Sequence, residues 1–428
     1  MQPVVVAASA NIAPEVDDGP GINHRSSRFS KVDSRFEANI IGFGAGSERA
    51  WLIGIDALFA GNDLVNRVAH LTGIPRDSLI VIASHTHSAP NLDPELPTLA
   101  PLSSRYLQRV AETISAKVLE LSQCSGSAFA ARHGSATTSG LVVNRRGWRL
   151  RLNRKPPFLR NYVAMVPNLI EPCLENIDTL VLFEGKTPKA VLWSFACHPV
   201  SYPDQSQAHP DYPGVIREDI RAALGNPELP VLFLPGMMGD QRPAEFDFSW
   251  GPMQISRGRL QGPTFGRFNE AEYRNWCEAI ANAVRRSLSS SKDEICCSAV
   301  VLQRETFDCR ELLSINVDKE TGIGCLYLEP GVALPWMEAE PVAAYDGLVR
   351  RHVKRPVVLP FGYVGSVFGY LPTSEMIDTG GYEDTRFKKM FGVLGDFRRD
   401  LTKIVEQAWE SATKASPQNS AREEVEQE

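Results

Sequence analysis

The sequence predicts an α/β fold in which mixed β-sheets are flanked by helices. Near the start of the chain, apolar runs of strand length and one helical stretch follow in the order β-β-α-β, with short connections. Hydrophobic residues make up 43% and charged residues 22% of the 428 residues, which is ordinary globular composition. Three expected strands also end in residues whose side chains can bind a metal or transfer a proton. These residues are His85 with His87, His198, and Asp240.

Hydrophobic periodicity justifies the individual elements. Apolar, β-branched runs predict strands, whereas apolar residues that recur every three to four positions predict amphipathic helices. Strands are expected over residues 3–8, 36–43, 50–58, 80–83, 179–183, 190–197, 230–234, 294–306 and 325–328. Helices are expected over residues 64–71, 103–122, 215–224, 271–288, 341–352 and 393–412.

The chain shows no internal repeat and no clear linker, so residues 1–412 are expected to form one domain. Residues 413–428 are polar and charged, which predicts a disordered tail. A basic, proline-containing loop is expected to run from Asn144 to about Asn161.

Composition excludes several classes of partner. The net charge of −6 provides no basic footprint for nucleic acid. No apolar run approaches the roughly 18 residues that span a bilayer, so we expect no stable membrane insertion. The N-terminus lacks the basic region of a signal peptide, and the eight cysteines form no CxxC pair. We therefore expect a cytoplasmic protein with reduced thiols that acts on a small molecule. The oligomeric state stays open.

Two predicted strands end in histidine. The apolar run Ile80–Ala83 stops at Ser84-His85-Thr86-His87, and the run over 190–197 leads into His198. If the chain stays extended after the first run, His85 and His87 point to the same side, because side chains alternate along a strand. Ligand sites of α/β sheets lie at the carboxyl ends of strands. These imidazoles are therefore candidates for metal ligands or acid/base groups, although a single histidine there is more simply a hydrogen-bonded polar residue.

A catalytic zinc site with two histidines needs a carboxylate or another oxygen ligand, and an open position for water. The residue types indicate an α/β metal-dependent hydrolase. By default, however, Arg145 and Arg146 are solvated loop charges and Tyr370 is a strand aromatic. The candidate carboxylates are Asp211, Asp240, Glu329, Glu338 and Glu340.

Four motifs together resemble those of the neutral/alkaline ceramidase family. Residues 85–90 (HTHSAP) are similar to its THTHSGP motif, and residues 195–201 (FACHPVS) to its FAxHPVS motif. Residues 239–243 (GDQRP) resemble GDxSP, and residues 369–373 with Tyr382-Glu383 resemble HYxTTxEEYxxxxYE. The motifs occur in the order of the family between residue 1 and about residue 395. The resemblance thus covers the catalytic domain and implies a neutral-ceramidase-like catalytic fold.

The resemblance also implies a Zn²⁺ site. Its position-by-position match makes His85, His198 and Tyr370 zinc ligands. The glutamate ligand of the family matches Glu340 best, within Ala339-Glu340-Pro341. The Pro-Gly of the family motif is missing there and a Pro-Gly pair stands nearby at 330–331, so Glu338 and Glu329 stay alternatives.

Further roles follow from the same resemblance. His87 matches a residue that contacts the substrate or the developing oxyanion, and Tyr382 matches a tyrosine that stabilises the tetrahedral intermediate. Asp240 belongs to the motif of the nucleophilic serine and is assigned with these catalytic residues. Arg145 matches an arginine that positions the substrate.

One position departs from the family. The proposed nucleophile, the serine of GDxSP, is Arg242 here. Arginine is always charged and cannot act as a nucleophile. Water activated by zinc can attack a carbonyl directly. Arg242 can then bind a carboxylate or phosphate of a polar substrate with two parallel hydrogen bonds.

The sequence therefore predicts a zinc-dependent hydrolase that cleaves an amide or ester bond in a small polar substrate by metal-activated water. A true ceramidase, an N-acylsphingosine amidohydrolase, is the first alternative. It is disfavoured by Arg242 and by our expectation of neither a secretion signal nor a C-terminal β-sandwich domain. A non-catalytic metal-binding protein of the same fold is the second alternative.

Overall fold

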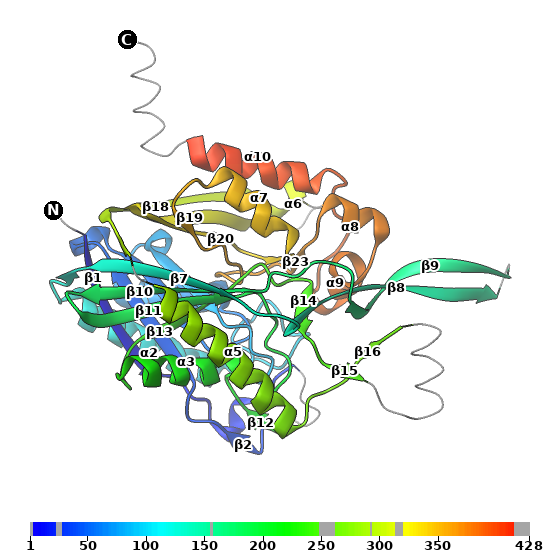
Figure 1. The fold of residues 1–428 in the computed structure, drawn as a ribbon, viewed down its shortest axis with the longest axis horizontal. Helices are drawn as coiled ribbons and strands as arrows, with labels where there is room; N and C mark the ends of the chain where they lie inside the picture. Colours follow the sequence, from blue (N-terminus) through cyan, green and yellow to red (C-terminus); the bar gives the residue numbers. More distant parts are fainter. Residues whose placement is uncertain are drawn as a thin grey trace, which may run out of the picture.

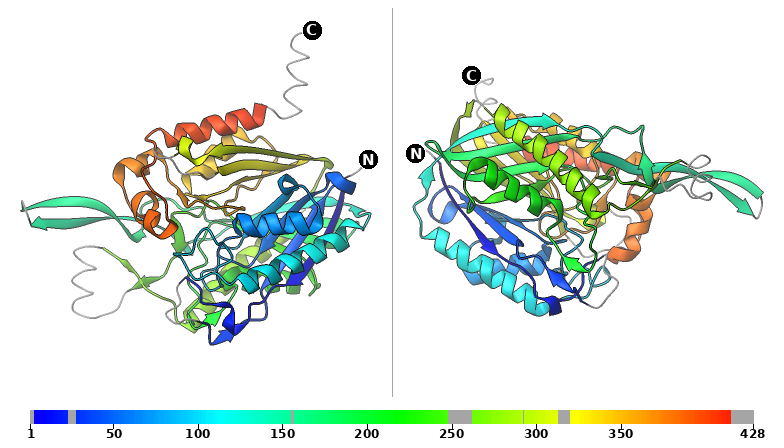
Figure 2. Two further views of the ribbon diagram at one scale, coloured as in Figure 1. Left: turned by 180° about the vertical axis from the view of Figure 1, so that it is seen from behind. Right: turned by 60° about the horizontal axis from the view of Figure 1, so that its bottom comes forward.

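The computed structural model describes residues 3–22, 28–154, 157–247, 262–291, 293–312 and 320–414. Two five-stranded β-sheets pack face to face at its centre, and a pair of helices covers the outer side of each sheet (Figure 1 and Figure 2). The strand orders are β5-β4-β3-β1-β6 and β13-β11-β10-β7-β17. Mixed sheets flanked by helices are thus confirmed, in a four-layer arrangement.

The first sheet is mixed, since β4 and β5 are parallel while its other pairs are antiparallel. Helices α1 and α2 pack on its outer face. The apolar stripe of α2, with Tyr106, Val110 and Ile114, is buried there, as its helical spacing predicts. The elements are β1 (Val4–Asn11), β3 (Glu37–Phe43), β4 (Ala50–Ile55), β5 (Leu79–Ala83), β6 (Ser127–Ala128), α1 (Gly61–Thr72) and α2 (Ser104–Ser122).

The second sheet is antiparallel except for the parallel pair β11 and β13. Helices α3 and α5 cover its outer face. Asn269 caps α5 by accepting hydrogen bonds from the backbone of Ala271 and Glu272, which fixes where this helix begins. The elements are β7 (Ala130–Thr137), β10 (Asn176–Glu184), β11 (Thr187–Phe195), β13 (Val231–Pro235), β17 (Glu294–Ile295), α3 (Asp211–Leu224) and α5 (Glu270–Ser290).

The interior between the two sheets is apolar and tightly packed. Side chains such as Ile80 and Ile82 of the first sheet meet Leu192 and Leu232 of the second. A Cβ on Gly54 of β4 would lie 2.6 Å from Cγ of Leu232, so glycine permits this close approach of the sheets.

We expected the strands that lead to His85, His198 and Asp240 to lie in one sheet system. They divide between two sheets: β5 belongs to the first, while β11 and β13 are neighbours in the second. An apolar run predicts a buried strand, but it does not predict the sheet to which that strand belongs. Face-to-face packing of the sheets still brings the ends of these strands together.

A third sheet completes the body. One face of it, with Leu326, Leu334 and Trp336, packs against the two-sheet core, and its other face packs against α7 and α10 (Figure 1). A separate two-stranded pair, β21 with β23, sets Glu340 directly beside Tyr370. The elements are β18 (Cys297–Asp308), β19 (Glu320–Pro330), β20 (Val332–Met337), β22 (Val357–Val358), β21 (Glu340–Pro341), β23 (Tyr370–Leu371), α7 (Ala344–His352) and α10 (Leu401–Lys414).

We expected the basic segment after Asn144 to be a loop. It is instead a β-hairpin that projects from the body (Figure 1 and Figure 2). It consists of β8 (Val142–Arg154) and β9 (Pro157–Asn168), and β14 (Gln241–Pro243) pairs with its root. The prolines suggested a loop. Pro157, however, begins β9, where a strand tolerates proline because no preceding ladder bond is lost.

The C-terminal helix differs in its bounds from our expectation. Helix α10 begins at Leu401 rather than at residue 393, and it includes Thr413 and Lys414 of the expected tail. The rest of that tail, 415–428, lies outside the described residues. No helix in the described part of the chain is long and apolar enough to cross a membrane. The short elements are β2 (Lys31–Val32), β12 (Gln207–Ala208), β15 (Phe246–Asp247), β16 (Thr264–Phe265), α6 (Cys309–Leu312), α8 (Ser374–Thr379) and α9 (Phe387–Phe391), three 3₁₀ turns (Val16–Asp18, Gly46–Glu48, Arg76–Ser78) and a π-helical turn (Tyr382–Arg386).

Candidate metal centre

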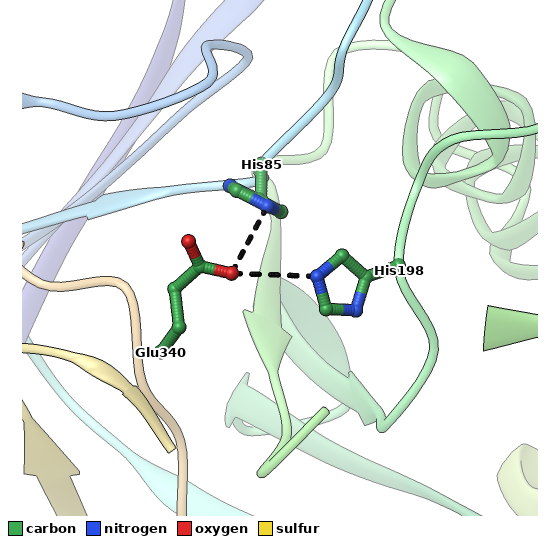
Figure 3. A group of neighbouring side chains, drawn as sticks. All are labelled: His85, His198 and Glu340. Atoms are coloured by element: carbon green, nitrogen blue, oxygen red, sulfur yellow. Dashed lines mark ion pairs between the residues drawn. The ribbon is translucent and has the colours of Figure 1, made fainter. Parts of the chain in front are cut away.

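Three buried side chains from distant parts of the sequence meet at the strand ends. Oε2 of Glu340 lies 3.4 Å from Nε2 of His85 and 3.3 Å from Nε2 of His198 (Figure 3). The ligand atoms of all three residues lie within 4.8 Å of one another. Two donors at about 2.1 Å from a tetrahedral zinc ion are about 3.4 Å apart. The two closest spacings therefore fit a zinc site.

Tyr370 joins this group from the neighbouring strand. Its hydroxyl lies 3.3 Å from Nε2 of His198, and the pairing of β21 with β23 holds it beside Glu340. Oε1 of Glu340 is buried and has no hydrogen-bond partner among the described residues. A buried carboxylate oxygen without a partner is costly, and a cation at this point would satisfy it.

Backbone carbonyls orient the two histidine rings. Nδ1 of His85 lies 3.0 Å from the carbonyl of Leu58, and Nδ1 of His198 lies 2.8 Å from the carbonyls of Met238 and Gln241. A carbonyl only accepts, so Nδ1 carries the proton in both rings. Each Nε2 lone pair is then directed at the centre, which is how a metal-binding histidine is usually held.

The backbone at His85 differs from our expectation. His85 has a φ of 65°, so the chain is not extended there, and the reasoning from strand alternation is wrong. The rings of His85 and His87 nevertheless converge, with 3.3 Å between their Nε2 atoms. The strand β5 ends at Ala83, and a left-handed residue then turns the chain. Such strain persists only where the surroundings hold it, and it is frequent at functional sites.

Burial sets the protonation of the centre. It lowers the pKa of His85 to about 4 and lowers the pKa values of His87 and His198 well below their usual range. Burial also raises the pKa of Glu340. The three imidazoles are therefore neutral near pH 7, the state in which a histidine binds a metal.

Arg145 lies beside the centre because of a β-bulge in β8 between Asn144 and Arg146. Consecutive residues of a regular strand point to opposite faces, but the bulge lets both arginines reach Glu383. Nε of Arg145 lies 2.8 Å and Nη1 of Arg146 lies 2.6 Å from the oxygens of this buried carboxylate. The guanidinium of Arg145 also stacks on the ring of Tyr370, 4.9 Å from its centroid.

A cavity of about 500 Å³ lies beside the centre, with Tyr370 on its lining. His87, Arg145, Tyr370 and Tyr382 line it, so the structure brings these four predicted residues to one wall. The rings of Tyr370 and Tyr382 are 5.4 Å apart, and Arg145 stacks on the second as well, 5.1 Å from its centroid.

Arg242 lines the same cavity. Its Nη2 lies 2.8 Å from Oε1 of the buried Glu245, and its guanidinium stacks on Phe265 at 4.2 Å from the ring centroid. Glu245 also accepts hydrogen bonds from the hydroxyl of Ser201 and the backbone of Phe268. These contacts hold Arg242 at the cavity wall rather than in solvent.

Asp240 does not line this cavity. One of its oxygens accepts from Nδ2 of Asn144 and the other from the backbone of Ala343, both at 2.8 Å. The backbone of Arg145 donates to its carbonyl, also at 2.8 Å. Asp240 therefore holds together the segments that carry Asn144, Arg145 and Ala343.

The other candidate carboxylates lie away from the centre. Glu338 pairs with Arg304 and lines a separate cavity beside α10. Glu329 pairs with Arg355 at 2.6 Å, and Asp211 accepts from the hydroxyl of Tyr273 at 2.8 Å. Among the described residues, Glu340 is the carboxylate that meets the two histidines.

Sequence reasoning missed three residues of the centre. Tyr363 donates to Oε2 of Glu340 at 3.3 Å, Glu383 holds the two arginines, and Glu245 holds Arg242. Glu383 stands within a motif that resembled the ceramidase pattern, so two adjacent arginines without a nearby acid could have indicated it. Tyr363 and Glu245 gave no signal, because neither stands in a recognisable motif.

The fold and the His-His-Glu group define an α/β protein with a candidate metal centre at the meeting point of two packed sheets. No protein-family model matches the sequence, and no curated protein matches it. Solved structures do match. The crystal structure of neutral ceramidase from Pseudomonas aeruginosa has a TM-score of 0.71 at 12% identity, over 97% of this chain and 74% of that one. A ceramidase complexed with C2 has a TM-score of 0.70 at 12% identity, over 99% of this chain and 76% of that one. The chain therefore has the fold of the neutral ceramidases.

Proposed function

We propose that this chain is a zinc-dependent hydrolase that cleaves an amide bond, or an ester bond, in a small polar substrate. The observation that carries this proposal is the convergence of His85, His198 and Glu340 beside a cavity. Tyr370 completes the group from the paired strand. Strand-end position, neutral imidazoles and an unpaired carboxylate oxygen all support a metal at this point.

His85, His198, Glu340 and Tyr370 would hold the zinc ion. When bound, zinc supplies Lewis acidity, which polarises a carbonyl and lowers the pKa of water. Backbone carbonyls hold the ring tautomers, the carboxylate of Glu340 stays buried, and Tyr370 connects the group to the cavity.

His87 and Tyr382 act on the reacting groups in this proposal. His87 is neutral near pH 7 and lies on the cavity wall, so its ring can accept or donate a proton at the scissile group. The hydroxyl of Tyr382 donates to the oxygen on which negative charge develops. Arg145, held by Glu383, positions the substrate from the same wall.

Arg242 gives the cavity its preference for anionic substrates. Its Nε is buried and has no hydrogen-bond partner among the described residues, and neither has Nη2 of Arg145. Arg267 lines the same cavity. A carboxylate or phosphate on the substrate would complement the positive charge of the three arginines that line the cavity, because guanidinium groups are strong donors to these anions.

Hydrolysis of ceramide is the alternative, and the fold shared with ceramidase structures favours it. The guanidinium groups that line the cavity disfavour it. Contact with alkyl chains would remove water from these charged groups and provide no hydrogen-bond acceptor in its place. A metal-binding protein without catalysis is the remaining possibility.

A substrate panel tests the proposal. The zinc-loaded protein is assayed with soluble N-acyl amino acids, uncharged N-acyl amines and ceramide in mixed micelles, alongside His198→Ala. We expect hydrolysis of the carboxylate-bearing amides, lost on chelation and restored by zinc, and at least on the order of 10³-fold lower in His198→Ala. Faster hydrolysis of ceramide would support the alternative. A zinc-loaded protein that hydrolyses none of them would contradict the hydrolase proposal.

A further inference from the structure

The β8–β9 hairpin forms an arm that extends away from the body (Figure 1 and Figure 2). Its two strands are paired without interruption from Arg146 with Met165 to Arg154 with Pro157, which is nine register pairs. At about 3.4 Å per residue the paired part is about 30 Å long. Part of the arm has partners in its own chain, since β9 contacts β16 and Arg149 donates to the carbonyl of Pro263. An isolated two-stranded ribbon is marginally stable in water, so the outer part of an arm of this length calls for a covering surface.

The arm exposes large apolar side chains. Trp148 and Leu150 are each 56% exposed and lie two residues apart, on the same face of β8. Leu169 and Ile170, which directly follow β9, are 65% and 94% exposed. Exposed apolar side chains such as the pair Trp148 and Leu150 are typical of a protein interaction surface, and tryptophan is enriched at the centres of such surfaces.

The sequence over residues 147–170 is basic, whereas the rest of the sequence has an excess of acidic residues. Residues 147–170 contain five basic residues and no acidic residue. Without these five, the chain has 40 basic and 51 acidic residues, a net charge of −11. A partner with a net negative charge, as the rest of this chain has, is therefore complementary to the arm. The basic residues are Arg149, Arg151, Arg154, Lys155 and Arg160.

We propose that the arm docks on the acidic body of a second copy of this chain, so that two copies form a dimer with reciprocal arms. A ribbon about 30 Å long and about 10 Å wide covers about 300 Å² of its partner. Two arms and the two surfaces beneath them bury about 1,200 Å², the lower end of the range for stable protein interfaces. A closed dimer in which each copy contributes the same elements is also the commonest symmetric assembly.

The mass of the protein in solution tests this proposal. Sedimentation velocity of the full chain at micromolar concentration is compared with the double variant Trp148→Ser/Leu150→Ser. The matched control is Leu71→Ser/Leu119→Ser, which removes two side chains that are 42% and 40% exposed on α1 and α2. Circular dichroism and the midpoint of thermal unfolding verify that both variants fold, as expected for changes at exposed sites.

We expect the wild-type chain and the control to sediment as dimers, and the arm variant as a monomer with at least a 100-fold weaker dimer affinity. Raising the salt concentration should also weaken the wild-type dimer, because the arm is basic. A wild-type monomer at all concentrations, or an arm variant that dimerises like the control, would overturn the proposal. A monomeric wild type that cosediments with phosphatidylserine vesicles, while the arm variant does not, would assign the arm to anionic membranes instead.

Discussion

Strand β8 carries both Arg145, which lies beside the candidate metal centre, and the outer part of the β8–β9 arm, yet opposite contacts hold these two regions. Arg145 of β8 is buried beside the centre, with Glu383 and two tyrosine rings around it. Only three residues further along β8, Trp148 is more than half exposed. The difference shows where a polar strand finds its partners. The root has its partners within its own chain, whereas the exposed apolar side chains of the outer arm would be covered in the proposed dimer.

Three candidate ligands of the centre are each held by a residue that is distant in sequence. Leu58 orients His85, Met238 orients His198, and Tyr363 donates to Glu340. Because these supports come from several sheets and loops, local opening at the centre would require much of the body to open. We therefore expect the centre to be rigid before any substrate arrives.

The largest expected effect is that of Glu383→Gln. This change leaves Arg145 and Arg146 buried without their carboxylate, so unfolding should become easier by about 3 kcal/mol. The control is Glu278→Gln, which removes an exposed partner of Arg285 and should cost less than about 1 kcal/mol. Urea unfolding followed by fluorescence measures both. Equal, small losses would mean that the buried pairs do not hold the root of the arm.

A second expected effect is the pH dependence of stability in the metal-free protein. The pKa of His85 is about 4 in the fold and about 6.5 when unfolded, so the unfolded chain binds more protons between these values. Stability due to His85 is present above pH 6.5 and is lost as the pH falls toward 4, by about 3 kcal/mol in total.

Glu340 opposes this trend, because burial raises its pKa and its contribution is instead lost as the pH rises. The measurement is therefore a difference, in which urea unfolding of wild type and His85→Gln is followed from pH 4 to pH 7. We expect the unfolding free energy of the variant to change less steeply with pH than that of the wild type. The difference in slope should correspond to at most one bound proton. Parallel curves would show that His85 is not held neutral by the fold.

A smaller effect is expected at the cavity wall. Arg242→Ser and Arg242→Ala remove the proposed anion contact, and a charge-assisted hydrogen bond contributes roughly 1.5–3 kcal/mol. For a carboxylate-bearing substrate, kcat/KM should fall on the order of 10- to 100-fold, mainly through KM. Arg242→Lys, which keeps the charge without the planar fork, should be intermediate. Unchanged kcat/KM in all three variants would remove Arg242 from substrate binding.

Part of the centre could be predicted because its signals are local. Two apolar runs that end in histidine identified the ends of β5 and β11, and both histidines meet there. Glu340 was one of several candidates, since a carboxylate has no spacing of its own. Its pairing with Tyr370 depends on two-residue strands, which are too short to show periodicity.

Other features could not be predicted from local patterns. The bulge that turns Arg145 inward and the left-handed φ of His85 follow from tertiary contacts. The arm was mistaken for a loop because its prolines and arginines suggested solvent. Beyond its root, the described part of the ribbon buries few side chains, Val163 among them, so hydrophobic alternation is a weak signal there.

The metal content of the purified protein tests the central claim most directly. Wild type, His198→Ala and Glu340→Gln are incubated with a zinc salt and freed of excess metal by gel filtration. Their zinc content is then measured by inductively coupled plasma mass spectrometry. We expect about one zinc ion per chain in the wild type and a large loss in both variants, because each lacks one of the converging ligands. Circular dichroism verifies that the variants are folded. A wild type without zinc, or folded variants that retain one zinc ion per chain, would contradict a metal centre at His85, His198 and Glu340.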